Sequence, residues 1–189
     1  MKDYTKLSLK EILAEAEKIS QEAQKRFLNL NEDQINWKPN PESWSVAQCF
    51  DHLICSSKSY FPQFDQIIQG KQKTTLLQLM PFLPGIWGRM LIRVLSPNSK
   101  KKLKAPKPFQ AASSKIDPQI ISKFAAQQRE LIAKIKATEG MNLEHVIITS
   151  PAIRLITYSL LDAYRMIVVH ERRHFNQAQR VTEAPGFPI

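Results

Sequence analysis

Four segments of the chain carry apolar residues at helical spacing, and this pattern constrains the fold more than any other feature. They run from about Leu9 to Leu30, from Ser45 to Gln69, from Asp117 to Gly140 and from Ser159 to Val181. Apolar side chains recur in each every three or four residues, as expected for the buried face of an α-helix. The alternating pattern of strands is nearly absent. We therefore predict an all-α fold, a four-helix bundle.

Short polar motifs mark where two of these helices begin. Ser8 with Glu11, and Ser45 with Gln48, have the spacing of a capping box, in which the first side chain accepts a bond from the backbone of the second. Pro62 lies inside the second segment and should kink or split it, because proline lacks a backbone donor. The long connections after the second helix and before the last favour a topology with crossovers over simple up-and-down packing.

The 189 residues are predicted to form a single domain, with residues 70–116 as an irregular basic insertion between the second and third helices. The stretch between Asp65 and Asp117 holds ten of the 27 lysines and arginines and none of the 17 acidic residues. A short helix is expected from about Ile86 to Leu95, packed near the bundle. The lysine-rich part, residues 97–108, is expected to be an exposed, mobile loop.

Cysteine usage and the first residues of the chain bear on location. Cys49 and Cys55 are six residues apart in one predicted helix, about 9 Å by helical rise, which is too far for a disulfide. We expect both to be small core residues rather than metal ligands. Free thiols and a charged N-terminal segment without an apolar stretch lead us to expect a cytoplasmic protein.

The strongest chemical signal is a pair of histidines in the last helix. His170 and His174 are four residues apart, so their rings lie one turn apart on one face of the helix, within its apolar stripe. Burying two imidazoles without partners is costly, and a metal ion would satisfy both. A third ligand must come from elsewhere. Of the other two histidines, His145 lies in a predicted loop, whereas His52 lies in the second helix, at the edge of its apolar stripe.

Other polar residues near these histidines are weaker candidates. Asp51 and Glu171 each adjoin a histidine, but adjacent residues on a helix diverge by about 100°. We therefore expect solvated or outer-shell carboxylates rather than a fourth ligand. Gln48 and Gln177 lie about one turn from a histidine, so either side chain could contact a metal-bound water. A structural role is an equal alternative for both, and no catalytic residue is assigned beyond these weak candidates.

The order of the motifs resembles one known family. The run Trp44–Gln48 leads into Asp51–Leu53, and His170 and His174 follow near the end with Gln177 behind them. This arrangement, spread over nearly the whole chain, is similar to the DinB-like superfamily. The resemblance implies a four-helix bundle that usually forms homodimers. Some members of that superfamily are thiol-dependent S-transferases, others are metal-dependent hydrolases, and many have no assigned activity.

The resemblance also implies one divalent ion held by three histidines, and those positions map onto His52, His170 and His174. Imidazole suits Zn²⁺ and Ni²⁺, which we expect first, and Fe²⁺ as an alternative. Three protein ligands leave coordination positions open, where an ion activates water or a thiol. The leading hypothesis is therefore a metal-dependent S-transferase or hydrolase acting on a small molecule, with an anionic thiol as one candidate.

Two alternatives belong to other classes of protein. The first is a non-catalytic metal-binding stress-response module. The second is association with nucleic acid or an anionic membrane through the basic residues 71–115. No nucleic-acid motif accompanies these lysines and arginines. A solvated loop is their simpler interpretation.

Overall fold

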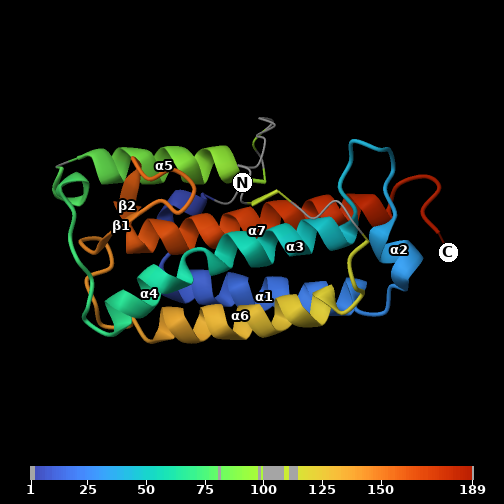
Figure 1. The fold of residues 1–189 in the computed structure, drawn as a ribbon, viewed down its shortest axis with the longest axis horizontal. Helices are drawn as coiled ribbons and strands as arrows, with labels where there is room; N and C mark the ends of the chain where they lie inside the picture. The colour runs from blue at the N-terminus through green and yellow to red at the C-terminus, as the bar shows by residue number, and fades with distance from the viewer. Residues whose placement is uncertain (1–2, 81, 98, 100–108, 111–114, 189) are drawn as a thin grey trace.

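The structure is a computed structural model that describes residues 3–80, 82–97, 99, 109–110 and 115–188 (Figure 1). It is all-α apart from one short pair of strands, as the apolar periodicity predicts. In chain order, the elements are η1 (Tyr4–Lys6), α1 (Leu9–Phe27), α2 (Glu32–Asn36), α3 (Val46–Lys58), α4 (Phe61–Ile68), η2 (Leu76–Leu79), α5 (Leu83–Leu95), α6 (Ile120–Lys136), β1 (Ile147–Thr149), β2 (Thr157–Ser159) and α7 (Leu160–Thr182).

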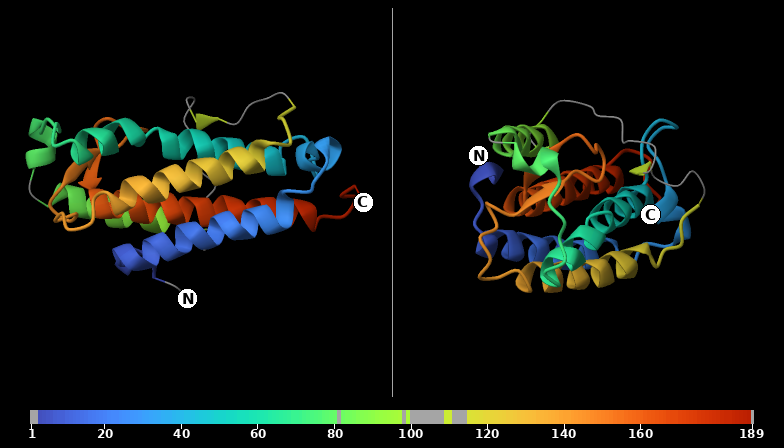
Figure 2. Two further views of the ribbon diagram at one scale, coloured as in Figure 1. Left: turned by 90° about the horizontal axis from the view of Figure 1, so that it is seen from below. Right: turned by 60° about the vertical axis from the view of Figure 1, so that its left-hand side comes forward.

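Helices α1, α3, α6 and α7 form the four-helix bundle. Helix α1 packs against α6 and α7, and α3 packs against the same two helices, so α1 and α3 are diagonal to each other. Figures 1 and 2 show that α1 and α7 run in one direction and that α3 and α6 run in the opposite direction. The chain must therefore return along the bundle between α3 and α6, which is the crossover expected there. The last connection, between α6 and α7, stays at one end of the bundle and makes no crossover.

The predicted motifs set the helix starts. Ser8 and Ser45 each accept a bond from the backbone three residues later, and Glu11 and Gln48 return it, so both capping boxes form. Pro62 lies in the first turn of α4 and separates it from α3, which is the split expected from its missing donor. Ser159 caps α7 by accepting a bond from the backbone nitrogen of Asp162, at 3.1 Å.

Several boundaries differ from the sequence prediction. Helix α1 ends at Phe27 rather than Leu30. Helix α6 begins at Ile120, because the side chain of Asp117 accepts a bond from the backbone of Gln119 in a turn before the helix. The expected linker between the first two helices contains α2, which has its own cap at Asn31. Strands β1 and β2 are three residues long and antiparallel, too short to show periodicity.

Helix α5 returns along the outside of the bundle, packed against α7, β2 and η1 (Figures 1 and 2). It begins at Leu83, three residues earlier than expected. Gly88 permits a close approach: a Cβ built there would meet Oδ2 of Asp162 at 2.2 Å. Most of the lysine-rich part of the insertion, residues 98 and 100–108, lies outside the described residues, so its mobility stays a prediction.

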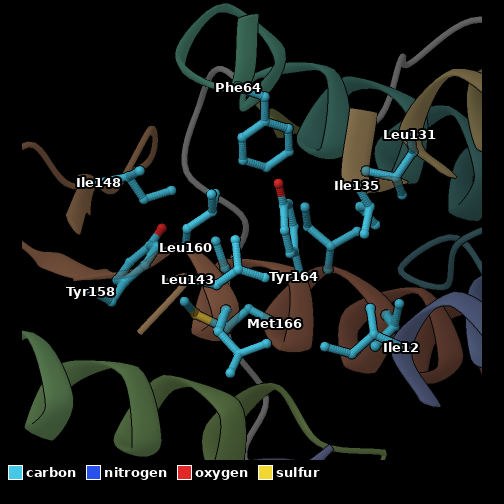
Figure 3. Packing of buried hydrophobic residues seen from close by; sticks show 14 of the residues in the cluster. Ile12, Phe64, Leu131, Ile135, Leu143, Ile148, Tyr158, Leu160, Tyr164 and Met166 are labelled. Carbon is cyan, nitrogen blue, oxygen red and sulfur yellow. The ribbon is translucent and has the colours of Figure 1, made fainter. Parts of the chain in front are cut away.

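The buried apolar residues of the described part of the chain form two clusters. The larger one surrounds Tyr164 of α7, whose ring packs edge-on against Phe64 at 5.1 Å between centroids (Figure 3). The Tyr164 hydroxyl lies 3.1 Å from Oγ1 of Thr138, which gives this buried polar group a partner. The second cluster is built around Phe50 and Phe124, whose ring centroids are 4.9 Å apart, and it includes Ile35 of α2. The second cluster joins α3 to Phe175, Ala178 and Val181 of α7, and the candidate site lies between those two helices.

Candidate metal centre

Three histidines converge where α3 and α7 pack together. His170 and His174 lie one turn apart on α7, with ring centroids 4.6 Å apart. His52 reaches them from α3, at 4.9 Å from the ring of His170 and 4.7 Å from that of His174. The structure thus brings together the three residues proposed from the sequence, across 118 positions of chain between His52 and His170.

The ring nitrogens are close enough to share one ion. One nitrogen from each histidine lies within 4.8 Å of the others. Nε2 of His52 is 3.1 Å from Nε2 of His170. Two nitrogens at that distance can both bind one ion, since metal–imidazole bonds are about 2.0–2.1 Å long. The group could therefore hold a metal ion.

A backbone carbonyl sets the orientation of the His52 ring. The oxygen of Phe109 lies 2.5 Å from Nδ1 of His52. A carbonyl oxygen can only accept a hydrogen bond, so Nδ1 carries the proton and Nε2 of the neutral ring keeps its lone pair. Histidines that bind metals are commonly oriented by such an outer carbonyl. No pattern in the sequence indicates this contact, because Phe109 belongs to the basic insertion, 57 residues away.

Burial keeps the three rings neutral. It lowers the pKa of His52, and it lowers that of His170 well below the usual value, with further lowering from His174, His52 and Arg173. The pKa of His174 falls to about 3, mainly through burial and then through His52 and Arg173, against an opposing contribution from Gln177. Neutral imidazoles are the form that binds metals, so protons compete little for these nitrogens.

One buried nitrogen of the site lacks a hydrogen bond. Nδ1 of His174 is shielded from solvent and has no partner among the residues that the structure describes. An unsatisfied buried polar atom is costly. An additional ligand, such as a metal ion or water, is the kind of group that would satisfy it, so the donor set fits a metal site.

Trp44 packs against two of the three rings. Its indole stacks on His174, with centroids 5.4 Å apart and planes 19° apart, and meets His52 edge-on at 5.0 Å. Trp44 directly precedes the cap residue Ser45, so the start of α3 fixes the position of the indole. Sequence reasoning noted this tryptophan as part of the family pattern but assigned it no role at the site.

The neighbouring acids and cysteines do not join the group. Glu171 is not solvated, contrary to one of the two expectations: it is fully buried and accepts bonds from Ser57 and Gln128, at 3.1 and 2.6 Å. Burial raises its pKa to about 7. Cys49 is buried as expected, whereas Cys55 is exposed and is not a core residue.

The two candidate glutamines differ in their surroundings. The side-chain oxygen of Gln48 accepts a bond from the backbone nitrogen of Ser45, at 3.2 Å, which supports the structural interpretation for this residue. A side-chain hydrogen bond between Gln177 and His174 raises the pKa of that imidazole, against the lowering effect of burial. Gln177 is therefore the better placed of the two to influence a ligand at the histidines.

Comparison with known proteins agrees with this geometry. The family model described as the DinB superfamily matches residues 15–178. The chain belongs to the DinB superfamily. The matched region includes all three histidines and most of the four bundle helices. No curated protein and no solved structure matches the chain. Among the described residues of this DinB superfamily member, no helix is both long and apolar enough to cross a membrane.

Proposed function

We propose that this DinB superfamily protein is a metal-dependent enzyme that activates a low-molecular-weight thiol, as an S-transferase does. The convergence of His52, His170 and His174, with one ring nitrogen of each within 4.8 Å of the others, carries the proposal. Zn²⁺ and Ni²⁺ are the ions we expect first, and Fe²⁺ is the alternative. Assembly as a homodimer stays a prediction from the family.

The composition of the site supports an open coordination sphere. No cysteine, aspartate or glutamate belongs to the group among the residues that the structure describes. Structural zinc sites are usually closed by four protein ligands, whereas catalytic sites have three. An ion bound here would supply Lewis acidity, lowering the pKa of a thiol or water that it coordinates.

The charge around the site favours a thiolate. Three neutral imidazoles leave the charge of a divalent ion uncompensated, so an anionic ligand is attracted. Arg173 lies close enough to lower the pKa of both His170 and His174, and it therefore adds positive potential. Its guanidinium is held by the carbonyl oxygens of Val94 and Ser96, at 3.0 and 3.4 Å.

The surrounding groups orient the histidines. The Phe109 carbonyl directs Nε2 of His52 toward His170, and the indole of Trp44 restricts the rings of His52 and His174. A hydrolase would in addition need a group that accepts a proton from water. The metal-ligating group contains no carboxylate for that role among the described residues.

Elemental analysis of protein purified without a metal-affinity tag tests the binding site. We expect one divalent ion per chain in the wild type and none in the His170→Ala/His174→Ala variant. The matched control is His145→Ala, since His145 is exposed and pairs with Asn142. A double variant that keeps stoichiometric metal would refute the assignment.

The cobalt-substituted protein tests the reaction class. Coordination of a thiolate should produce a sulfur-to-cobalt charge-transfer band when small cellular thiols are added. With the site fully occupied, the absence of this band for every thiol would favour hydrolysis or a non-catalytic role.

A further inference from the structure

Exposed apolar side chains are concentrated in one part of the molecule. The described residues include twelve large hydrophobic side chains that are exposed, and eight of them lie between Leu76 and Met90. Leu76 is 86 % exposed and Phe82 85 %. A concentration of exposed large apolar side chains is a common mark of an interaction site. The concentration in η2 and α5 therefore calls for a partner.

Helix α5 has a buried face and an exposed face of distinct composition. Pro84, Gly88 and Ile92 are buried against the bundle. The opposite side exposes Ile86 and Met90 together with Arg89 and Arg93, which line a shallow depression with Val94. This solvent side is neither a polar face nor a purely apolar one. It combines large apolar side chains with cations.

The charge of this region is of one sign. Residues 66–116 contain no aspartate or glutamate, and Lys71, Lys73, Arg89 and Arg93 are all exposed. Acidic groups from packed elements are few: Asp162 of α7 pairs with Arg165, and Asp3, before η1, lies near Arg93. The charged groups shown beside Ile86 and Met90 are therefore the cations Arg89 and Arg93.

The loop between β1 and β2 repeats this composition. Strand β2 packs against α5, and the loop between β1 and β2 leads directly into that strand. Ile153, Arg154 and Leu155 in this loop are exposed, with Leu155 at 76 %. A second segment, joined to a strand that packs against α5, thus exposes aliphatic and basic side chains.

We propose that this region binds the surface of an anionic membrane. We call it the α5 face and define it by Leu79, Phe82, Ile86, Arg89 and Met90. Interfacial helices insert apolar side chains among lipid headgroups while cations contact anionic headgroups, and the α5 face offers both. With 13 residues, α5 is about 20 Å long and would lie along the surface rather than span it.

Other partners fit the α5 face less well. Nucleic acids are bound by cations together with aromatic side chains that stack on bases, and the α5 face exposes one aromatic ring among aliphatic residues. A second copy paired about a two-fold axis would bring the same basic face against itself, and like charges in an interface are unfavourable. An anionic lipid surface satisfies both the apolar and the charged groups.

Vesicle flotation tests the proposal with the full-length protein. Vesicles of phosphatidylcholine alone are compared with vesicles containing about 30 % phosphatidylglycerol, at roughly 0.05 M and 0.5 M salt. The variant Leu79→Ser/Ile86→Ser/Met90→Ser removes apolar groups without changing the charge. All three positions are exposed, so the fold should persist, which circular dichroism can verify.

We expect binding to the anionic vesicles only, weakened at the higher salt. The triple variant should reduce the partition coefficient about tenfold or more, because three apolar side chains lose their insertion. The control Leu28→Ser/Met141→Ser, at exposed apolar positions elsewhere, should bind as the wild type does. Arg89→Gln should weaken binding, whereas Lys18→Gln on α1 should not.

Three results would overturn the proposal. The first is no binding of the wild type to anionic vesicles at the lower salt. The second is a triple variant that binds anionic vesicles as well as the wild type does, which would indicate that the protein adsorbs through its net charge alone. In the same way, retention on DNA that the triple variant does not weaken would indicate that the region binds nucleic acid. The third is that the wild type forms a dimer and does not bind vesicles, whereas the triple variant is a monomer. That result would assign the α5 face to a second copy of the chain.

Discussion

The indole of Trp44 stacks on the imidazole of His174, with ring centroids 5.4 Å apart and planes 19° apart. The same indole meets His52 edge-on, so one side chain restricts a ligand candidate on each of two helices. Ser45, the next residue, caps α3. The start of α3 is thereby linked to the geometry of the candidate metal centre.

Replacing Trp44 should weaken metal binding more than it alters the fold. We expect Trp44→Ala to raise the dissociation constant for Zn²⁺ about tenfold or more, because outer groups that orient ligands typically contribute that much. Trp44→Phe keeps an aromatic ring and should recover part of the affinity. Competition with a chromophoric chelator measures the constants.

Trp37 provides the matched control for this experiment. It packs against Phe187 near the C-terminus, at 5.6 Å between ring centroids, and among the described residues its ring does not pack against the three histidines. Trp37→Ala should leave the metal affinity unchanged. Equal affinities for Trp44→Ala and the wild type would show that the stacking does not support the site.

The four bundle helices could be predicted because each buries a face over several turns, and the periodicity over such lengths is unmistakable. Helix α2 and strands β1 and β2 could not, since five or three residues show no period. The start of α5 was also missed: Phe82, before it, has a φ of 65°, which local propensity does not favour. Helices α3 and α6 run in the same direction, so the chain must return along the bundle between them, and α5 makes this crossover.

The candidate site was predictable in part for similar reasons. His170 and His174 are four residues apart on one helix, so local geometry alone pairs them. His52 lies at the edge of its apolar stripe, and only the resemblance to a family indicated it. The contacts of Phe109 and Trp44 with these rings depend on tertiary packing. No spacing in the sequence encodes them.

Metal binding should stabilise the protein through the histidines alone. An ion that binds only the native state, at a free concentration of 1,000 times its dissociation constant, adds about 4 kcal/mol to the free energy of unfolding. We expect this gain for the wild type in urea denaturation and its loss with chelator. The His170→Ala/His174→Ala variant should show no gain.

Helical content should not depend on the ion. The two apolar clusters bury side chains from all four bundle helices, and this packing does not involve the histidines, so the far-ultraviolet circular dichroism of the chelated wild type should match that of the loaded protein. A chelator that unfolds the bundle at room temperature would contradict this view. It would indicate that the ion, rather than the apolar packing, holds the helices together.

Glu171 should act through packing rather than as a ligand. Its carboxyl group is fully buried and accepts bonds from Ser57 and Gln128. Glu171→Gln keeps the size and a hydrogen-bonding oxygen, so metal stoichiometry and stability should both be close to wild type. Glu171→Ala leaves a cavity and two polar groups without this partner, which should lower the free energy of unfolding by about 2–4 kcal/mol. Loss of metal in Glu171→Gln, measured by elemental analysis, would instead make Glu171 a ligand.

Two glycines in α5 should respond oppositely to the same substitution. At Gly85, an added Cβ would have Nη1 of Arg89 as its nearest neighbour, at 3.6 Å, which is ordinary contact. Gly85→Ala should therefore raise the free energy of unfolding by up to about 1 kcal/mol, because alanine loses less backbone entropy in a helix.

At Gly88, the Cβ would meet Oδ2 and Cγ of Asp162 at 2.2 and 2.8 Å, and Asp162 is itself held by Arg165. Gly88→Ala should lower the free energy of unfolding by about 1–3 kcal/mol, as overpacking does. Urea denaturation of the two variants in parallel measures both effects, and a Gly88→Ala protein as stable as Gly85→Ala would show that α5 does not pack against α7 as closely as the structure places it.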